Sequence, residues 1–273
     1  MNKKISVITG ATSGIGEAVS YMLGQEFELF ITSSSSARLN KALKGLEEKG
    51  IMATGMVCDI SNYDQVYSLA ERAAKLGKVA NVVNSAGVAP AQCDAERVLK
   101  INALGTAYVI EAFYQVMEER SVLINISSTA PRTVAGISIP TELLRLDPLM
   151  PEFLEEVMKQ CKQFPEKAAG GMAYIFSKWF VSDYTARNAK RFGGKGIRIL
   201  SVSPGTIMTP FYYNGAKDTS DKMLDKTPLM RHGRPEEVGE LIRFLASDKA
   251  GFITGTDIIC DGGLVSGLSL QQI

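Results

Sequence analysis

The residues Ile5-Ser-Val-Ile-Thr-Gly-Ala-Thr-Ser-Gly-Ile-Gly16 open the chain with a β-rich run that passes at once into a glycine-rich turn. The run from Ile5 to Ile8 predicts a buried strand, and residues 16–23 predict a helix. Glycine permits a tight turn and a close approach of the backbone. A helix that begins here presents free N–H groups, to which a dinucleotide pyrophosphate can bind. The alternative interpretation is an ordinary strand–helix turn.

Outside this stretch, short apolar runs alternate with helical patterns, which is typical of a parallel sheet with helices on both faces. Further strands are predicted over residues 29–31, 52–57, 79–83, 122–126, 197–202 and 258–260. Helices are predicted over residues 38–48, 64–74 and 235–246. No linker, repeat or low-complexity segment interrupts this order. We therefore predict an α/β fold with a single doubly wound, Rossmann-type domain over residues 1–273.

Composition and charge agree with a globular enzyme of 273 residues, 45% of them hydrophobic and 22% charged. The net charge of +1 gives no basic field, so neither nucleic acid nor a membrane is an expected partner. No apolar run is long enough to span a bilayer, and the first residues lack a signal-peptide core, so we expect a cytoplasmic protein. The cysteines at 58, 93, 161 and 260 are far apart, which predicts reduced thiols without a disulfide or metal site.

A second informative stretch is Tyr174-Ile-Phe-Ser-Lys178. Residues four apart share a helix face, so the phenol and the ammonium can point into one site. A phenol has an ordinary pKa of about 10, which is too high for acid–base catalysis near neutral pH. A nearby positive charge favours the phenolate and is expected to lower that pKa. The alternative for this pair alone is a solvated helix face.

Three further motifs accompany these two stretches: Asn84-Ser-Ala-Gly87, Ile126-Ser-Ser128 and Ser203-Pro-Gly205. In this order the motifs resemble those of the short-chain dehydrogenase/reductase family, from residue 5 to about residue 263. The spacing Gly10-xxx-Gly14-x-Gly16 is similar to the TGxxxGxG variant of that family. The resemblance implies an NAD(P)-dependent oxidoreductase that interconverts a secondary alcohol and a ketone by hydride transfer.

The catalytic group that the resemblance implies is Asn102, Ser128, Tyr174 and Lys178. Tyr174 would give its proton to the carbonyl oxygen, and Ser128 would hold that oxygen in place. Lys178 would lower the tyrosine pKa and bind the nicotinamide ribose, while Asn102 would help to hold a water molecule. Ser128 is preferred to Ser127 as the second serine of the family's I-S-S pattern. Two buried serines at a strand end are the alternative.

The resemblance also implies cofactor contacts. Asp59 would meet the adenine amino group, although it could equally cap a helix. Asn84 would brace the sheet, and Pro204, Gly205 and Thr209 would line the nicotinamide side. The expected cofactor-binding residues are Gly10, Ser13, Gly14, Ile15, Gly16, Ser33, Ser34, Arg38, Asp59, Ile60, Asn84, Ala86, Gly87, Tyr174, Lys178, Pro204, Gly205, Ile207 and Thr209.

The residues after the second strand, Thr32-Ser-Ser-Ser-Ser-Ala-Arg38, favour NADP(H). An NAD site usually has an acidic residue here to hold the ribose 2′-hydroxyl, and this stretch has none. Serine hydroxyls and Arg38 could bind a 2′-phosphate. Family members with a strong NADP preference usually place an arginine where this chain has Ser34 or Ser13. NAD(H) therefore stays possible. The alternative for this stretch is a polar turn in which Arg38 points into solvent and binds no phosphate.

Two spacings differ from the usual family pattern. The approach to Asn102, over residues 88–101, is short. Ser128 and Tyr174 are 46 positions apart, whereas the family usually sets them about a dozen apart. An apolar stripe lies between them, formed by Phe153, Leu154, Val157, Met158, Cys161 and Phe164. We expect residues 129–171 to form a helical insert that acts as a substrate lid. The stripe would be covered by a bulky substrate, the C-terminal region or a second subunit.

These spacings, together with Gly170-Gly-Met-Ala-Tyr174, resemble the 3α-hydroxysteroid dehydrogenase/carbonyl reductase branch of the family. That branch implies a small-molecule substrate, either a hydroxysteroid or another bulky apolar carbonyl or alcohol. It also implies a homodimer or homotetramer. A ketoreductase for a different hydrophobic substrate and a non-catalytic nucleotide sensor are the alternatives, and the intact catalytic group argues against the sensor. His232 is expected to be structural. Tyr212-Tyr213 is expected at a substrate cleft wall or at an interface.

Overall fold

Seven parallel strands form one sheet in the computed structural model, which describes residues 3–134 and 136–270. The strands lie in the order β3-β2-β1-β4-β5-β6-β7. Their bounds are β1 Lys4–Thr9, β2 Glu28–Ser33, β3 Ala53–Val57, β4 Lys78–Asn84, β5 Val122–Ile126, β6 Arg198–Pro204 and β7 Asp257–Cys260. The inner strands are almost wholly buried, as expected for a sheet that is covered on both faces.

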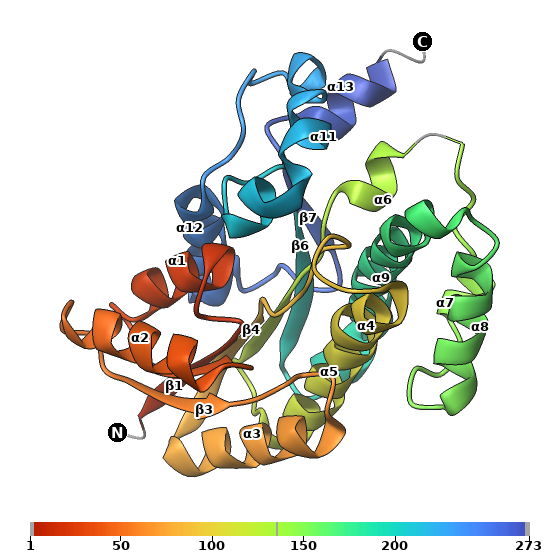
Figure 1. Ribbon diagram of the computed structural model, residues 1–273. Helices are drawn as coiled ribbons and strands as arrows, with labels where there is room; N and C mark the ends of the chain where they lie inside the picture. Colours follow the sequence, from red (N-terminus) through yellow and green to blue (C-terminus); the bar gives the residue numbers. More distant parts are fainter. Residues whose placement is uncertain (1–2, 135, 271–273) are drawn as a thin grey trace.

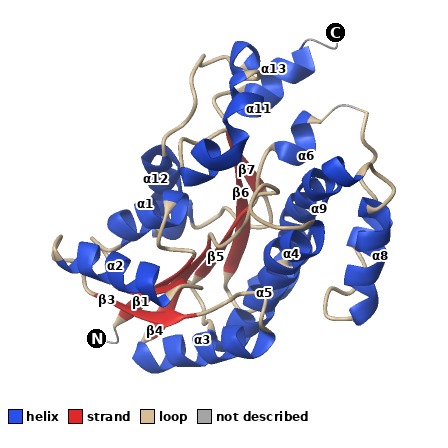
Figure 2. Ribbon diagram, viewed as in Figure 1, coloured by secondary structure: helices blue, strands red, loops and turns tan. Residues whose placement is uncertain are grey.

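Helices cover the two faces of this sheet (Figure 1). One face carries α1 Gly14–Leu23, α2 Ser36–Glu47 and α12 Pro235–Ala246, whose apolar stripes form one core cluster. The other carries α3 Tyr63–Leu76, α5 Gly105–Val116 and α9 Glu166–Arg187, which form a second and larger cluster. The strands, red in Figure 2, lie between the two helix layers. The predicted Rossmann-type, doubly wound fold is confirmed.

All seven predicted strands and the predicted helices are present, with small differences at their ends, and the helix over 235–246 has the predicted bounds. The sequence analysis predicted no helix between the strands at 79–83 and 122–126. The structure has α4 Ala95–Leu99, a π-helical turn η1 Lys100–Leu104 and α5 there. Seven of the twelve residues of α5 are buried, and its polar face is narrow, with Glu111 and Gln115 one turn apart.

The long insert is helical, as predicted, with α6 Ala130–Thr133, α7 Thr141–Leu144 and α8 Pro151–Cys161 before α9. The expected partners of its apolar stripe are wrong. Phe153, Val157 and Cys161 are fully buried against α9 and α4 of the same chain, and the rings of Phe153 and Phe180 lie 5.1 Å apart. Because α9 is apolar on several sides, it needs this outer layer, which Figure 1 shows beyond α9. The lid role stays a prediction.

The remaining elements lie after Arg187. They are α10 Ala189–Gly193, the π-helical turn η2 Tyr212–Ala216, α11 Lys217–Asp221, the 3₁₀ turns η3 Leu224–Lys226 and η4 Asp248–Ala250, and α13 Leu264–Leu270. Over residues 3–134 and 136–270, no helix has the length and apolar character needed to cross a membrane.

Candidate active site

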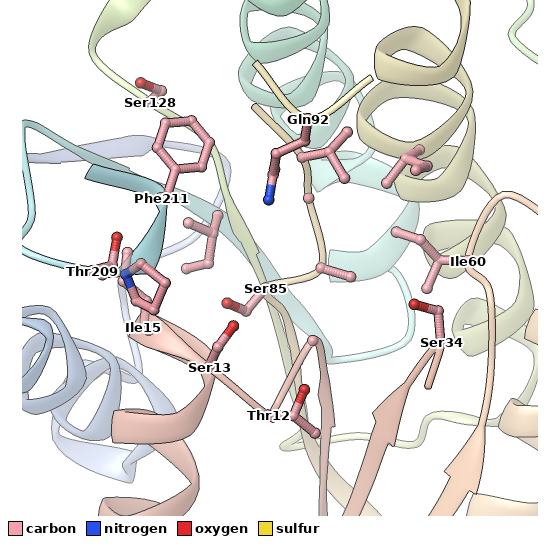
Figure 3. Close-up of a pocket in the computed structure, with 18 of the residues that line it drawn as sticks. Thr12, Ser13, Ile15, Ser34, Ile60, Ser85, Gln92, Ser128, Thr209 and Phe211 are labelled. Atoms are coloured by element: carbon pink, nitrogen blue, oxygen red, sulfur yellow. The ribbon is translucent and has the colours of Figure 1, made fainter. Parts of the chain in front are cut away.

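A pocket of about 320 Å³ lies at the carboxyl ends of the central strands (Figure 3). The strand order changes direction at β1, whose neighbours are β2 and β4, so the loops after these strands diverge and leave a crevice. The walls come from the glycine turn, the loops after β2, β3, β4 and β5, the middle of α9 and the segment after β6.

The glycine turn approaches its neighbours too closely for side chains. Gly10 has a φ of +64°, and a Cβ there would lie 2.7 Å from the Cα of Ala86. Gly14 has a φ of +58°, and its Cβ would lie 3.1 Å from Thr209. A Cβ on Gly16 would collide with the carbonyl oxygen of Gly10. Gly16 therefore packs under the turn and does not line the pocket, whereas the other two glycines do.

The first turn of α1 faces this pocket. Ser13 precedes the helix in an extended conformation, and its side chain makes no capping hydrogen bond to the first turn. The helix therefore presents donors that its own cap does not satisfy. Ser13, Gly14 and Ile15 line the pocket at this point, and Figure 3 shows the side chains of Ser13 and Ile15. This cradle fits a pyrophosphate, which binds well at a helix N-terminus.

A cluster of hydroxyl groups lies at the end of β2. Ser33 Oγ accepts hydrogen bonds from the Thr12 hydroxyl at 3.3 Å and from Ser35 N–H at 3.2 Å. The Arg38 guanidinium donates to Ser34 Oγ at 3.4 Å, which keeps it at the pocket wall. Ser33, Ser34 and Arg38 thus meet at one corner without a carboxylate between residues 32 and 38.

Asp59 and Ile60 line the pocket beyond that corner. The carboxylate of Asp59 pairs with Arg97 at 2.6 Å and accepts hydrogen bonds from Ser61. The cap of α3 is Asn62, whose side chain accepts from Gln65 N–H. The alternative of Asp59 as a helix cap is therefore wrong, because the chain continues through a further turn before the helix begins.

Two asparagines lie behind the pocket wall. Asn84 Nδ2 donates to Thr106 and Asn125, and its Oδ1 accepts from Thr9, so its amide ties β1, β4 and β5 together. Asn102 Oδ1 accepts from Val88 N–H at 2.9 Å, and Nδ2 donates to Val88 O at 3.0 Å. Both amides hold backbone that leads to Ala86 and Gly87, which line the pocket themselves.

Ser128 and Tyr174 lie together at the pocket wall, where the Ser128 hydroxyl acts to lower the pKa of the phenol. The hydroxyl of Ser127 points elsewhere: it donates to Lys178 O at 2.6 Å and accepts from Ser182 at 2.9 Å. The structure therefore places Ser128, rather than Ser127, beside the phenol. This difference arises because successive residues at the end of β5 point in opposite directions.

Lys178 lies one turn beyond Tyr174 on α9. Its Nζ donates to Ile126 O at 2.9 Å and lies 5.8 Å from the centre of the Tyr174 ring. Burial lowers the pKa of Lys178 to about 8. Burial also raises the pKa of Tyr174, against the opposing effect of the hydrogen bond with Ser128. The expected lowering of the tyrosine pKa by Lys178 is not seen in this structure: burial dominates the shift, and the ammonium is not among its causes.

Several pocket residues were missed by the sequence analysis. Phe211 packs its ring against Tyr174 with the centroids 5.8 Å apart, and Figure 3 shows its ring at the pocket. Tyr212 and Tyr213 do not line the pocket: Tyr212 is buried against Asp221, and Tyr213 is exposed. The other missed residues are Thr12, Cys58, Ser85, Val88, Gln92, Arg97, Ile101, Ile126, Ser127 and Pro210. Most are neighbours of predicted positions, but Gln92, Arg97 and Phe211 carried no local signal.

The other expected site residues, Pro204, Gly205, Ile207 and Thr209, line the pocket together after β6. His232 lies away from it, 2.8 Å from Asp221 and against the Tyr212 ring, in a structural contact. Within residues 3–134 and 136–270, no group of three or more His, Cys, Asp or Glu side chains could hold a metal ion.

Comparisons with known proteins match almost the whole chain. The family model described as short chain dehydrogenase matches residues 4–138, and the model described as Enoyl-(Acyl carrier protein) reductase matches residues 163–265. A short-chain dehydrogenase/reductase from Alternaria brassicicola is 31% identical, covering 98% of each chain. A 3-oxoacyl-(acyl-carrier-protein) reductase from Thermotoga maritima is 29% identical, covering 96% of this chain and 98% of the relative.

Among solved structures, a short chain dehydrogenase from Burkholderia cenocepacia in complex with NADP superposes with a TM-score of 0.74. The match covers 96% of this chain and 97% of that one, at 20% identity, and concerns the fold alone.

Proposed function

Because the chain belongs to the short-chain dehydrogenase/reductase family, and is thus an oxidoreductase with a nicotinamide-cofactor fold, we propose that it interconverts a secondary alcohol and a ketone. The observation that carries this proposal is the placing of Ser128, Tyr174 and Lys178 in one pocket with the glycine cradle, with Lys178 one helical turn from Tyr174. A proton donor and a dinucleotide cradle in one pocket are what carbonyl reduction requires.

Each residue has a distinct role in the proposed reaction. A bound nicotinamide supplies the hydride in the reduction and accepts it in the oxidation. Tyr174 donates its hydroxyl proton to the substrate oxygen, and the raised pKa keeps that proton in place until the oxygen becomes basic. Ser128 holds the oxygen by a hydrogen bond. Lys178, with a pKa of about 8, carries a positive charge over much of the neutral range and favours the phenolate that remains.

NADP(H) is the proposed cofactor. The corner at the end of β2 presents the hydroxyls of Ser33 and Ser34 and the guanidinium of Arg38, all at the pocket wall. These groups can donate to a 2′-phosphate, whereas an acidic acceptor for a ribose 2′-hydroxyl is missing from residues 32–38.

The proposed substrate is a hydroxysteroid or another bulky apolar carbonyl compound. Val88, Ile101 and Phe211 add apolar surface to the pocket, and Phe211 lies against the proposed proton donor. The Thermotoga relative is named for a 3-oxoacyl substrate, whose oxo group is a ketone on an apolar chain. A ketoreductase for such a different hydrophobic substrate is therefore the second candidate. A non-catalytic sensor would not need the Ser128–Tyr174 pair.

We also propose that the chain forms a homodimer or homotetramer. β7 is an edge strand of the sheet, its Ile259 is 42% exposed, and Phe252 in the loop before it is fully exposed. An open sheet edge with apolar side chains favours association. Molar mass from light scattering on a sizing column tests this proposal, and a monomer at micromolar concentration would refute it.

The experiment for the reaction uses Tyr174→Phe, which removes the hydroxyl and little else. We expect turnover of a steroid ketone and of a simple aryl ketone to fall by roughly 10²–10⁴-fold, while the affinity for NADPH stays within about twofold. Absorbance of NADPH and NADH follows the rates, and fluorescence titration gives the affinity. A variant that kept more than about a tenth of the parent rate would refute tyrosine-centred catalysis. A parent that prefers NADH would refute the cofactor assignment alone.

A further inference from the structure

A closed ring of hydrogen bonds lies in the pocket wall beyond Ser34. Arg97 Nη2 donates to Asp59 Oδ2 at 2.6 Å, and Arg97 Nη1 donates to Ser61 Oγ at 3.1 Å. Ser61 closes the ring by donating its own hydroxyl to Asp59 Oδ1 at 2.7 Å. The ring connects α4 with the loop after β3 across 38 residues of sequence. Both Arg97 and Asp59 line the pocket.

This ring adjoins the corner assigned to the 2′-phosphate. Ser33 pairs with Val57 in the sheet, and Cys58 N–H donates to Ser33 O at 3.0 Å, so the ends of β2 and β3 lie side by side. Asp59 follows immediately. Of the described residues that line the pocket, Asp59 is the one carboxylate.

The Asp59 carboxylate is ionised in this setting. Burial alone would raise its pKa, but hydrogen bonds from Ser61 and Arg97 outweigh burial and hold the pKa below its usual range. An ionised carboxylate at this corner would repel a 2′-phosphate, which carries negative charge itself. It would repel a ribose hydroxyl much less. The positive charge of Arg97 offsets this repulsion, so Arg97 can affect the choice between NADP(H) and NAD(H) as well as holding α4 in place.

We infer that Arg97 is a specificity-determining residue, which lets the pocket accept a 2′-phosphate by cancelling the charge of Asp59. This inference rests on the proposed preference for NADP(H). Arg97 acts here through Asp59, in contrast to Arg38, which stands at the corner with Ser34 and has the 2′-phosphate as its direct partner. The competing explanation is that the ring only ties α4 to the sheet, in which case its loss would weaken every adenine nucleotide equally.

A double-mutant cycle separates the two explanations. The variants are Arg97→Gln, Asp59→Asn and the double variant, with Lys100→Gln as the matched control. Lys100 directly follows α4, pairs with Glu96 on the surface and does not line the pocket. Calorimetric titration with 2′,5′-ADP and with 5′-AMP measures affinity without catalysis, and thermal unfolding of each variant reports on the structural cost.

We expect Arg97→Gln to weaken 2′,5′-ADP about three- to fivefold more than 5′-AMP, the size expected for one uncancelled charge at the edge of a watery pocket. The double variant should recover the parent ratio, because the carboxylate is gone as well. The selective loss should shrink in roughly 1 M salt, where charges are screened within about 3 Å. Lys100→Gln should leave the ratio unchanged.

Equal losses for the two nucleotides would overturn the inference and assign the ring to structure. A selective loss that persists in the Asp59→Asn background would also overturn it, because Arg97 would then contact the phosphate directly. A parent that binds 5′-AMP more tightly than 2′,5′-ADP would refute the NADP preference, while the change in ratio between variants would still measure the coupling.

Discussion

At the scale of single residues, the site combines groups whose burial opposes their charge. Tyr174 keeps its proton because burial raises its pKa, and Lys178 loses part of its charge because burial lowers its pKa to about 8. Burying the Lys178 ammonium, which donates to the backbone acceptor Ile126 O, costs desolvation free energy and destabilises the folded protein. Its presence is therefore better explained by chemistry than by folding.

Lys178→Met is expected to make the protein inactive and more stable at pH 7. The pKa of Lys178 is about 8 in the folded protein and near 10.5 when unfolded, so between these values the unfolded chain binds more protons and the parent gains stability as pH rises. Below about pH 8 the full burial cost is present, on the order of 3 kcal/mol. The lost hydrogen bond to Ile126 O offsets about 1 kcal/mol of the gain.

Urea unfolding of both proteins at pH 7 and at pH 10 measures this effect. The methionine variant should be more stable by about 2 kcal/mol at pH 7, and the difference should shrink or reverse at pH 10. A difference that does not change with pH would show that Lys178 titrates normally.

At the scale of elements, the turn between β1 and α1 depends on glycine in two ways. Gly10 and Gly14 have positive φ angles, whereas Gly16 is helical and is required because a Cβ would strike the carbonyl of Gly10. The sequence motif does not distinguish these reasons, but they predict different effects of substitution.

We expect Gly16→Ala to destabilise the protein by about 1–3 kcal/mol and to weaken NADPH binding, because the clash must move the turn that forms the cradle. The matched control is Gly171→Ala in α9, where a Cβ would meet nothing within 4 Å. That change should stabilise the helix by about 0.5–1 kcal/mol. Urea unfolding measures the stability of the two variants, and titration with NADPH measures their cofactor affinity. Equal changes in the two variants would contradict the steric argument.

At the scale of the whole molecule, the insert before Tyr174 is an outer layer on the fold. Phe153, Val157 and Cys161 are fully buried in the same cluster as the sheet-facing side of α9. Of the described residues that line the pocket, none belongs to 129–171. The insert therefore supports the helix that carries Tyr174 and Lys178, and any closure over substrate would have to come from its other parts.

Phe153→Ala is expected to cost about 3–5 kcal/mol of stability, because it leaves a cavity against Phe180. Leu149→Ala, at a position 45% exposed on the same insert, should change stability by less than about 0.5 kcal/mol. Urea unfolding at neutral pH measures both. A small cost for Phe153→Ala would show that α8 separates readily from α9 in solution, as a mobile lid requires.

The seven strands, the glycine turn and the Tyr174–Lys178 spacing were predictable from sequence, because each depends on residues only a few positions apart. Side-chain alternation, helical periodicity and the steric freedom of glycine are local properties. The bounds of α12 followed from Pro235 and the two glutamates after it, which suit a helix start. The buried helix α5 was missed because its polar face is narrow, so few polar residues mark its helical period.

The sequence by itself thus determined the fold class, the place of the nucleotide cradle and the identity of the catalytic group that we propose. Only the tertiary structure decided what the insert covers, that Phe211 lies on Tyr174, and that Arg97 meets Asp59 across 38 residues. It also decided the direction of the Tyr174 pKa, which depends on desolvation by the surrounding chain. Local motifs set the backbone, whereas contacts and burial between distant segments arise from packing, for which no short stretch carries a signal.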